Sequence, residues 1–455
     1  MTKKSKSMAK IVSCIIFAAM MVLNLVLPAF AADYSTGTSS EDPAKAAITK
    51  VFSMPINTPT PASEFIFTFE KIGMNEPLDT TAMAGMPAIP DVPISFTSGE
   101  EPAGGTFVSG DTKSVVKESG NFLAGLLPSD WANGEGIYKY RVYENMTVGK
   151  SNITIVDAEK EGASYSIAKY DVEVWVEKDD NGILFPKFVC VKIVENFIDE
   201  YYEGSEGGEK VDPTPGGVKQ VPGDPTIEDD FSQVIFTNKY WKTDGGGEPD
   251  PEESALEIIK KITGNGANLA EYFSFDVKVT QPSVIPTLQT YKAYVLDKGG
   301  NIVTSTDNFG TLETDDNGEK YIEFTSGVKL TEIKLTNEQR LAFADLHIGA
   351  TVEAEEAASA DYIPSYQRSF AGTSEFKGVK NAAFGFPRST QDPGPHYIGS
   401  GAKTNHATFT NTRSGATPTG ISVDNLPFIV LIGAAIAGLV GFVVVRTRKN
   451  AKCDI

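Results

Sequence analysis

The sequence predicts an all-β protein in which two β-sandwich domains are joined end to end, and three observations lead to this prediction. Apolar and polar residues alternate over short segments bounded by turn residues, a pattern typical of half-buried strands. An ordered set of residues recurs in the two halves of the chain. The ends of the 455-residue chain are specialised, which leaves roughly 390 residues, enough for two domains with cores of their own.

The first segment, residues 1–31, has the composition of a secretory signal peptide. Lysines precede an apolar stretch over residues 11–27, and the small-residue exit Ala29, Phe30, Ala31 follows. We expect cleavage near Ala31. A permanent membrane anchor is the alternative, and the short apolar length disfavours it.

The opposite end predicts a membrane span at residues 426–445 and a basic cytoplasmic tail at 446–455. The span is apolar or small throughout and, at about 1.5 Å per helical residue, is long enough to cross a bilayer. Positive charge stays on the cytoplasmic side, so the chain before residue 426 is expected outside the cell. A buried core helix is the alternative.

Composition narrows the function classes. The net charge of -20 disfavours nucleic acid and anionic membrane surfaces as partners. Two of the three cysteines, Cys14 and Cys453, lie in the terminal segments, so the exported part cannot form an intrachain disulfide. The remaining Cys190 lies in an alternating segment and is interpreted as a small core residue.

The sequence contains few of the motifs that are typical of enzymes. Its three histidines, His347, His396 and His406, lack metal-ligand spacing, and we find neither a nucleophile elbow nor a phosphate loop. We therefore predict that the protein is not an enzyme and has no cofactor or metal. Hydrolysis by a carboxylate pair stays open, although no pair is singled out.

An acidic, glycine-rich break at residues 241–253 predicts a linker between a first domain at 32–240 and a second at 254–413. Residues 414–425 then connect to the membrane segment. Within the first domain, residues 197–233 are rich in Gly, Pro and acidic residues and predict a long surface excursion.

Each domain carries a hairpin signal. In the first, a predicted strand at 165–177 is followed by the turn Asp180-Asn181-Gly182 and a second strand at 183–194. In the second, Asp316-Asn317-Gly318 precedes a strand at 321–324. The acidic turns could suggest calcium loops, but they lack the spaced oxygen ligands of an EF-hand.

The internal repeat has three parts in the same order. Each half opens with a strand ending in lysine and an aromatic strand, continues with a glycine-led strand ending in glutamate, and closes on Phe-Thr-Asn. The chain positions are Lys50, residues 65–69, Glu144 and Asn238 in the first half, and Lys260, residues 273–277, Glu356 and Asn411 in the second.

These residue types have a specific joint chemistry. If the first and last strands of a sandwich lie side by side, the lysine amine and the asparagine carboxamide can meet in the core. Burial disfavours the ammonium, so the lysine can become a neutral nucleophile. Burial also favours a protonated glutamate, which can polarise the carboxamide and pass protons as ammonia leaves. The product would be a Lys–Asn isopeptide bond. The alternative is that these residues simply begin and end exposed strands.

This constellation resembles the backbone pilins of Gram-positive bacteria, in particular the streptococcal T-antigen type. The resemblance implies Ig-like, CnaB-like sandwiches, with one bond joining Lys50 to Asn238 beside Glu144 and another joining Lys260 to Asn411 beside Glu356. Glu355 is the alternative glutamate of the second domain. We prefer Glu356 because strand alternation places it on one face with Val352 and Ala354.

Ahead of the membrane segment, Ala416, Thr417, Pro418, Thr419 and Gly420 are similar to the pilin-type variant of the sortase sorting motif, although they depart from the common Leu-Pro-x-Thr-Gly form at the first two positions. The resemblance implies cleavage between Thr419 and Gly420 and transfer of Thr419 to an amine. Permanent membrane retention and a eukaryotic GPI signal are the alternatives. The basic tail disfavours the latter.

The resemblance also implies partners and a location. A polymerising pilin needs an acceptor lysine, for which Lys219 and Lys210 are candidates. The partners would be a sortase, further copies of the chain, accessory pilins and cell-wall peptidoglycan, with the protein secreted and wall-anchored after a membrane-spanning precursor. The rival function is a singly anchored adhesin that binds a host or surface ligand.

Overall fold

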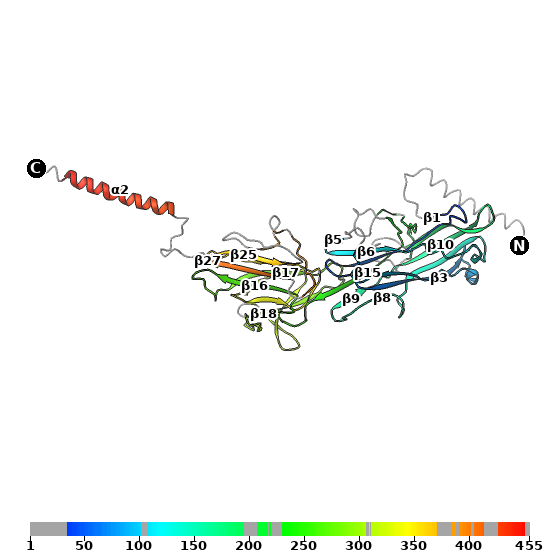
Figure 1. Ribbon diagram of the computed structural model, residues 1–455, viewed down its shortest axis with the longest axis horizontal. Helices are drawn as coiled ribbons and strands as arrows, with labels where there is room; N and C mark the ends of the chain where they lie inside the picture. Colours follow the sequence, from blue (N-terminus) through cyan, green and yellow to red (C-terminus); the bar gives the residue numbers. More distant parts are fainter. Residues whose placement is uncertain are drawn as a thin grey trace.

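The computed structural model describes residues 34–101, 108–194, 207–216, 218–219, 230–305, 309, 311–370, 384–387, 392, 394–401, 405–413 and 426–450. Figure 1 shows two β domains that follow one another along the long axis of the molecule. The predicted all-β fold with tandem sandwiches is confirmed.

The first domain has two main sheets and two short 3₁₀ helices, η1 (Thr81–Gly85) and η2 (Pro128–Asp130). The larger sheet runs in the order β1 (Tyr34–Thr36), β11 (Leu184–Ile193), β10 (Lys169–Lys178), β7 (Gly136–Glu144), β3 (Ser63–Met74) and β4 (Val92–Phe96), with β12 (Lys210–Val211) beside β11 and β8 (Asn152–Ile153) beside β3. The facing sheet contains β15 (Ile235–Asp244), β2 (Thr49–Pro55), β6 (Thr112–Glu118) and β5 (Val108–Ser109), with β9 (Glu161–Ser164) beside β15. A small pair, β13 (Val218–Lys219) and β14 (Asp230–Phe231), is separate.

The second domain repeats this two-sheet plan. One sheet runs β19 (Glu313–Thr314), β20 (Lys320–Thr325), β18 (Thr290–Leu296), β22 (Arg340–Phe343), β16 (Leu256–Thr263), β27 (His406–Arg413) and β25 (Tyr362–Ser369). The other runs β21 (Lys329–Leu335), β17 (Phe273–Thr280), β24 (Thr351–Glu356) and β26 (Phe384–Phe386). A short strand, β23 (Leu346–His347), pairs with β15 of the first domain.

Alternation along the strands builds a separate core in each domain. On β3, Phe65, Phe67 and Phe69 point inward while Glu64 is exposed, and on β17 Phe273 and Phe275 are buried in the same way. Because a strand turns every second side chain to the same face, each aromatic strand covers one wall of a core. Each buried Phe contributes about 1.5–3 kcal/mol relative to an exposed one.

The junction between the domains is ordered by one long strand. β15 continues to Asp244 and there pairs with β23, so the predicted linker at 241–253 begins in a strand and its first residues are part of the ladder. The fold extends β15 because pairing with β9 and β23 satisfies its backbone groups, which composition alone did not reveal.

Side chains from both domains close the junction. The Asp111 carboxylate accepts hydrogen bonds from the Ser283 N–H, at 2.7 Å, and from the Ser283 hydroxyl. Tyr397 donates its hydroxyl to Gly110 O at 3.0 Å. Gly349 adopts φ +81° against Pro55, whose Cβ would lie 2.6 Å from any added Cβ, so this position requires glycine.

One predicted strand is shorter than expected. The segment 165–177 reads as a single alternating strand, but β10 begins only at Lys169. β9, on the facing sheet, ends at Ser164, and the chain crosses between the two sheets over residues 165–168. Alternation continues through this crossing, which is why the sequence pattern does not mark it.

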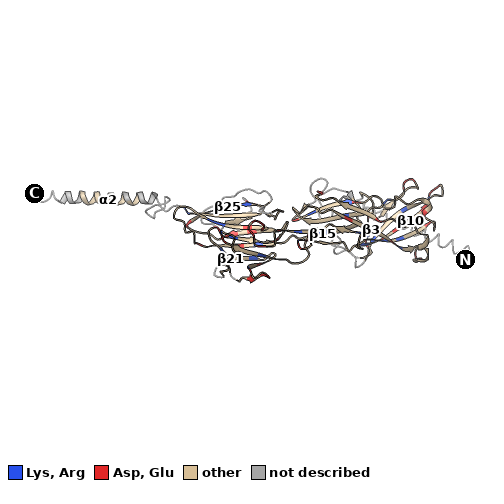
Figure 2. Cartoon of the chain, turned by 60° about the horizontal axis from the view of Figure 1, so that its bottom comes forward, with Lys and Arg blue, Asp and Glu red and all other residues tan. Residues whose placement is uncertain are grey.

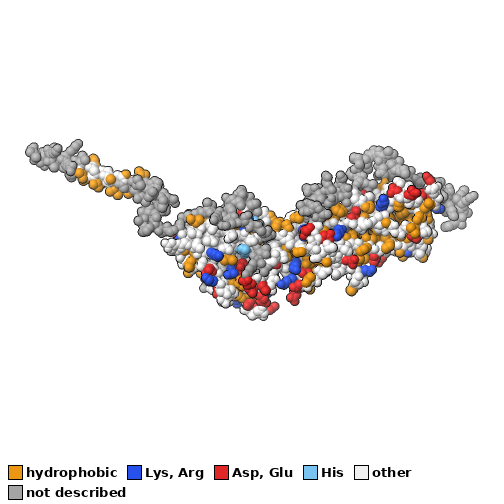
Figure 3. All heavy atoms as spheres, viewed as in Figure 1, with side chains coloured by type: hydrophobic (Ala, Val, Ile, Leu, Met, Phe, Trp, Pro, Cys, Tyr) orange, Lys and Arg blue, Asp and Glu red, His pale blue; other side chains and the backbone are white. Residues whose placement is uncertain are grey.

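Charged residues are distributed along both domains. Figure 2 shows Lys and Arg interspersed with Asp and Glu on the strands and loops. Figure 3 shows a mixed surface, with acidic side chains gathered along the lower side of the second domain near the junction.

Helix α2 (Leu426–Asn450) covers the segment predicted to cross the membrane. Within the part of the chain that the structure describes, no helix has the length and apolar character that a membrane crossing requires. The predicted signal peptide at 1–31 and sorting motif at 416–420 lie outside the described residues.

Candidate functional site: two buried lysine, glutamate and asparagine clusters

Lysine and asparagine are brought together by a parallel strand pair in each domain. In the first, β2 and β15 align Lys50 with Phe236 and Phe52 with Asn238. Since side chains two residues apart share a face, Lys50 and Asn238 become diagonal neighbours on the core side. The second domain repeats this register on β16 and β27, where Lys260 pairs with Phe409 and Ile262 with Asn411.

The glutamates come from the facing sheets. Glu144 ends β7 and pairs with Phe67 of the aromatic strand β3. Glu356 ends β24 and pairs with Phe275 of β17. The side chain of each glutamate therefore extends from its own sheet into the core, where it contacts the lysine and asparagine of the facing sheet. We call Lys50, Glu144 and Asn238 the first cluster, and Lys260, Glu356 and Asn411 the second cluster.

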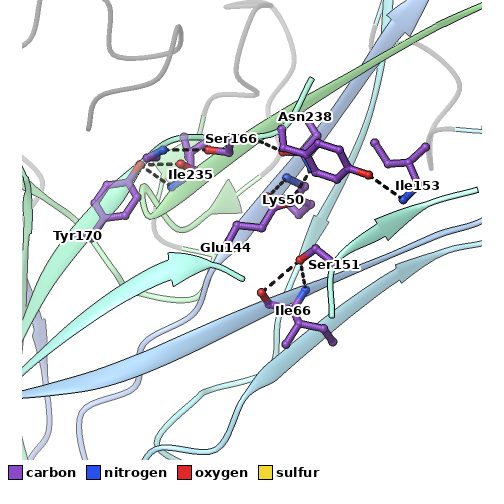
Figure 4. A network of polar contacts seen from close by, with 11 residues as sticks. Lys50, Ile66, Glu144, Ser151, Ile153, Ser166, Tyr170, Ile235 and Asn238 are labelled. Atoms are coloured by element: carbon purple, nitrogen blue, oxygen red, sulfur yellow. Dashed lines mark hydrogen bonds and ion pairs between the residues drawn. The ribbon is translucent and has the colours of Figure 1, made fainter. Parts of the chain in front are cut away.

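In the first cluster, the Glu144 carboxylate bridges the other two side chains. Lys50 Nζ lies 2.7 Å from Glu144 Oε2, and Asn238 Nδ2 donates to Glu144 Oε1 at 2.7 Å. The lysine nitrogen also lies 4.3 Å from the centroid of the Phe65 ring. Figure 4 shows the three side chains converging between the sheets, together with the polar contacts around them.

The second cluster has the same contacts. Lys260 Nζ lies 2.8 Å from Glu356 Oε2, and Asn411 Nδ2 donates to Glu356 Oε1. Lys260 Nζ lies 4.2 Å from the centroid of the Phe273 ring. Two domains of one chain thus place the same three residue types in the same relation to an aromatic strand.

The clusters are shielded from water. The side chains of Lys50 and Glu144 are both 0% exposed, and those of Lys260 and Glu356 are 0% and 2% exposed. Burial lowers the pKa of Lys260 to about 8, against the opposing effect of Glu356. Burial likewise raises the pKa of Glu356, against hydrogen bonds from Lys260 and Asn411. Both shifts favour the neutral forms, an amine and a carboxylic acid.

This arrangement provides each component of an acyl transfer. A buried lysine in its neutral form is a nucleophile, and the lowered pKa of Lys260 favours that form in the second cluster. The carboxamide carbon of asparagine is an electrophile, and a carboxyl group that touches both nitrogens can carry a proton from one to the other. Only the fold brings these groups within contact, since Lys50 and Asn238 lie far apart in the chain.

The structure distinguishes the two neighbouring glutamates of β24. Glu356 points into the core, whereas the Glu355 side chain is 50% exposed and lies 3.8 Å from Lys329. Since successive side chains on a strand point to opposite faces, only one of the pair can reach Lys260.

Replacing each of these two glutamates by alanine is therefore expected to have opposite effects on a covalent linkage in the second domain. Glu356→Ala should abolish any covalent linkage between Lys260 and Asn411, because it removes the proton carrier and leaves the buried lysine unpaired. Glu355→Ala, the matched control one residue away, should leave that linkage intact. Peptide mapping by mass spectrometry of the two purified variants checks this, and loss of the linkage in Glu355→Ala alone would contradict the placement.

Other predicted residues lie away from the clusters. Lys210 is exposed on β12, opposite Lys192 of β11, and Lys219 pairs through its backbone with Asp230. Cys190 is buried on β11, as a core residue would be. His347 and His396 are buried in the second domain. Among the described residues, no group of three or more His, Cys, Asp or Glu has the arrangement of a metal site.

One contact of the first cluster was not anticipated from the sequence. The Ser166 N–H donates to Asn238 Oδ1 at 2.7 Å. Ser166 belongs to the crossing at 165–168, which the sequence pattern assigned to a strand. The local signal could not have revealed this contact, because it depends on where β9 leaves the ladder of β15.

Comparison with known proteins gives one partial family match. Residues 254–413, which contain β16 to β27, match the model of a domain family described as a domain of unknown function (DUF7601). None of the curated proteins matches the chain.

Several solved structures are similar to the chain. The major pilin T3.2 of Streptococcus pyogenes is 15% identical, with 81% of this chain and 98% of that chain covered and a TM-score of 0.27. The major pilin T-13 of Streptococcus pyogenes is 16% identical, with 84% and 100% covered and a TM-score of 0.26. The pilus-presented adhesin Spy0125 (Cpa) is 10% identical, with 81% and 100% covered and a TM-score of 0.22.

Proposed function

We propose that the chain is a structural subunit of a covalently polymerised pilus anchored to the cell wall, and that each sandwich domain is closed by a Lys–Asn isopeptide bond. The observation that carries this proposal is the occurrence of two buried clusters with the same contacts in tandem domains. A buried ion pair costs desolvation free energy and is weak evidence of stabilisation by itself. Duplication of such a costly arrangement, each time beside a buried asparagine, is the pattern expected of a reaction site.

The reaction would proceed once in each domain. The neutral lysine Nζ attacks the asparagine Cγ, and the carbonyl oxygen takes up the negative charge. The glutamate carries a proton from Nζ to Nδ2, the Cγ–Nδ2 bond breaks, and ammonia leaves as the carbonyl re-forms. One amine and one primary amide become one secondary amide and ammonia, so no oxidant, cofactor or metal takes part.

The position of each bond suits a load-bearing subunit. Lys50 lies near the start of the first domain and Asn238 near its end, on adjacent parallel strands. Lys260 and Asn411 hold the corresponding positions in the second domain. Tension entering at one terminal strand would pass through the covalent bond to the other, so the sheets between them would not have to unfold. The pairing of β15 with β23 continues this path from the first domain into the second.

Assembly and anchoring belong to the same proposal and rest on the sequence. A sortase would cleave between Thr419 and Gly420 of a membrane-held precursor and transfer Thr419 to a lysine of another copy, to an accessory pilin or to peptidoglycan. Lys210 and Lys219 are the proposed acceptors. The structure leaves Lys210 accessible on β12.

Polymerisation is tested on cells that produce the protein. Wall extracts boiled in denaturant should give a ladder of high-mass species that react with an antibody to the chain. The double variant Lys210→Ala with Lys219→Ala should collapse the ladder to the monomer. Lys298→Ala, which removes an exposed lysine of the second domain, should leave the ladder unchanged. A single wall-released band from the unaltered protein would favour an adhesin over a shaft subunit, and an unchanged ladder in the double variant would exclude both acceptors.

A further inference from the structure

The two clusters differ at the asparagine carbonyl, which is the atom that must take up negative charge. In the first cluster, Asn238 Oδ1 accepts a hydrogen bond from the Ser166 N–H at 2.7 Å. Figure 4 shows Ser166 and Glu144 both beside the Asn238 side chain, with a dashed line from Ser166 to Asn238. In the second cluster, Asn411 Oδ1 is buried and accepts no hydrogen bond from any residue that the structure describes.

The origin of this difference lies in the strand beside each asparagine. β9 pairs with β15 only as far as Ser164, opposite Lys239, so the chain leaves the ladder before it reaches Asn238. Beyond this point the Ser166 N–H donates to the Asn238 side chain. β25 instead pairs with β27 along its whole length, and the residue opposite Asn411 is Pro364, which has no N–H.

The Ser166 donor is held in place by its surroundings. Ser166 is buried, and its hydroxyl accepts a hydrogen bond from the Ala168 N–H at 3.2 Å. The Tyr170 hydroxyl donates to Ile235 O at 2.6 Å and accepts from the Ile235 N–H at 3.2 Å, which ties the start of β10 to the start of β15. The donor is thus positioned before any reaction takes place.

The contact also fixes the orientation of the carboxamide. A backbone N–H can only donate, so the atom it meets must be the carbonyl oxygen of Asn238, and Nδ2 must face Glu144. In this orientation the carboxyl group of Glu144 touches the attacking nitrogen of Lys50 and the leaving nitrogen of Asn238.

We propose that the Ser166 N–H is the catalytic hydrogen-bond donor that stabilises the developing oxyanion in the first domain, and that the second domain reacts without an equivalent donor. This inference rests on the proposed cross-linking reaction. As Lys50 Nζ attacks Cγ, Asn238 Oδ1 gains the charge that the N–H stabilises, while Glu144 moves the proton to Nδ2 and ammonia leaves. Preorganised donors aimed at a developing oxyanion typically contribute about 10²–10³ in rate. The first bond should therefore form faster than the second.

The donor can be removed without changing any side chain. Cell-free synthesis with the α-hydroxy analogue of serine at position 166 replaces the Ser166 N–H with an ester oxygen. The chain is purified in denaturant, refolded at neutral pH and quenched at intervals, and both cross-links are followed by peptide mapping. We expect the first cross-link to form about 10²-fold more slowly or not at all, and the second to keep its rate as an internal control. Ser166→Ala, which keeps the N–H, should change the first rate by far less.

Each result has a distinct meaning. An unchanged rate of the first cross-link in the ester chain would overturn the role of Ser166 and leave the proposed function intact. Absence of both cross-links from the unaltered protein would overturn the reaction itself. If the first domain of the ester chain fails to fold, the rates of the two cross-links in the unaltered protein test the inference instead. Its first cross-link should form at least about tenfold faster than the second during one refolding experiment, and equal or slower formation would overturn the inference.

Discussion

The intact mass of the exported segment, residues 32–419, is expected to fall two ammonia masses below the value given by its sequence. Each cluster holds a lysine nitrogen and an asparagine carboxamide in contact with one buried carboxyl group, so each domain should lose one ammonia after folding. Asn238→Ala and Asn411→Ala should each reduce the deficit by one, after correction for the substitution. Electrospray mass spectrometry of the purified protein measures this directly.

Asn405→Ala is a matched control for these variants. Asn405 is as buried as the cluster asparagines, but within the described part of the chain its side chain bonds backbone groups alone. It accepts from the Gly399 N–H at 2.8 Å and donates to Ala255 O at 3.0 Å. Its removal should leave both ammonia deficits in place. A mass equal to the sequence in the unaltered protein would mean that the clusters are ordinary buried ion pairs, and the cross-linking proposal would fall.

Loss of the first cross-link should cost the first domain about 5 kcal/mol of unfolding free energy. The bond would close a loop of about 190 residues, and loop closure of this length restricts the unfolded chain by that amount on the disulfide model. For a domain of this size we expect Asn238→Ala to lower the Tm by about 10–20 °C. Scanning calorimetry of the isolated variant and the unaltered protein gives the difference.

Comparison with Lys50→Ala separates the covalent contribution from that of the ion pair. Asn238→Ala leaves Lys50 paired with Glu144, whereas Lys50→Ala also strands a buried carboxyl group, which costs roughly a further 3–5 kcal/mol. The lysine variant should therefore unfold at the lower temperature. A Tm for Asn238→Ala within a few degrees of the unaltered protein would show that no covalent bond had closed the loop.

The sequence was most informative about features that depend on the order and alternation of residues. The tandem all-β fold was predictable because alternating segments and turn residues are local features, and the structure confirms it. The repeated order of Lys, Glu and Asn also pointed to the six residues that the fold brings into contact. Alternation on one strand was enough to prefer Glu356 over Glu355, since the two must face opposite ways.

The tertiary structure alone decided where strands end and which sheets face each other. Residues 165–168 alternate like a strand but cross between sheets, and this crossing delivers the Ser166 N–H to Asn238. β15 runs past residue 240, the predicted end of the first domain, because β23, about a hundred residues later, pairs with it. Hydrogen-bonded partners from distant parts of the chain set these strand boundaries. The boundaries therefore cannot be predicted from the residues of the strand alone. The sequence thus determined the chemical groups of each cluster, and long-range strand pairing determined what surrounds them.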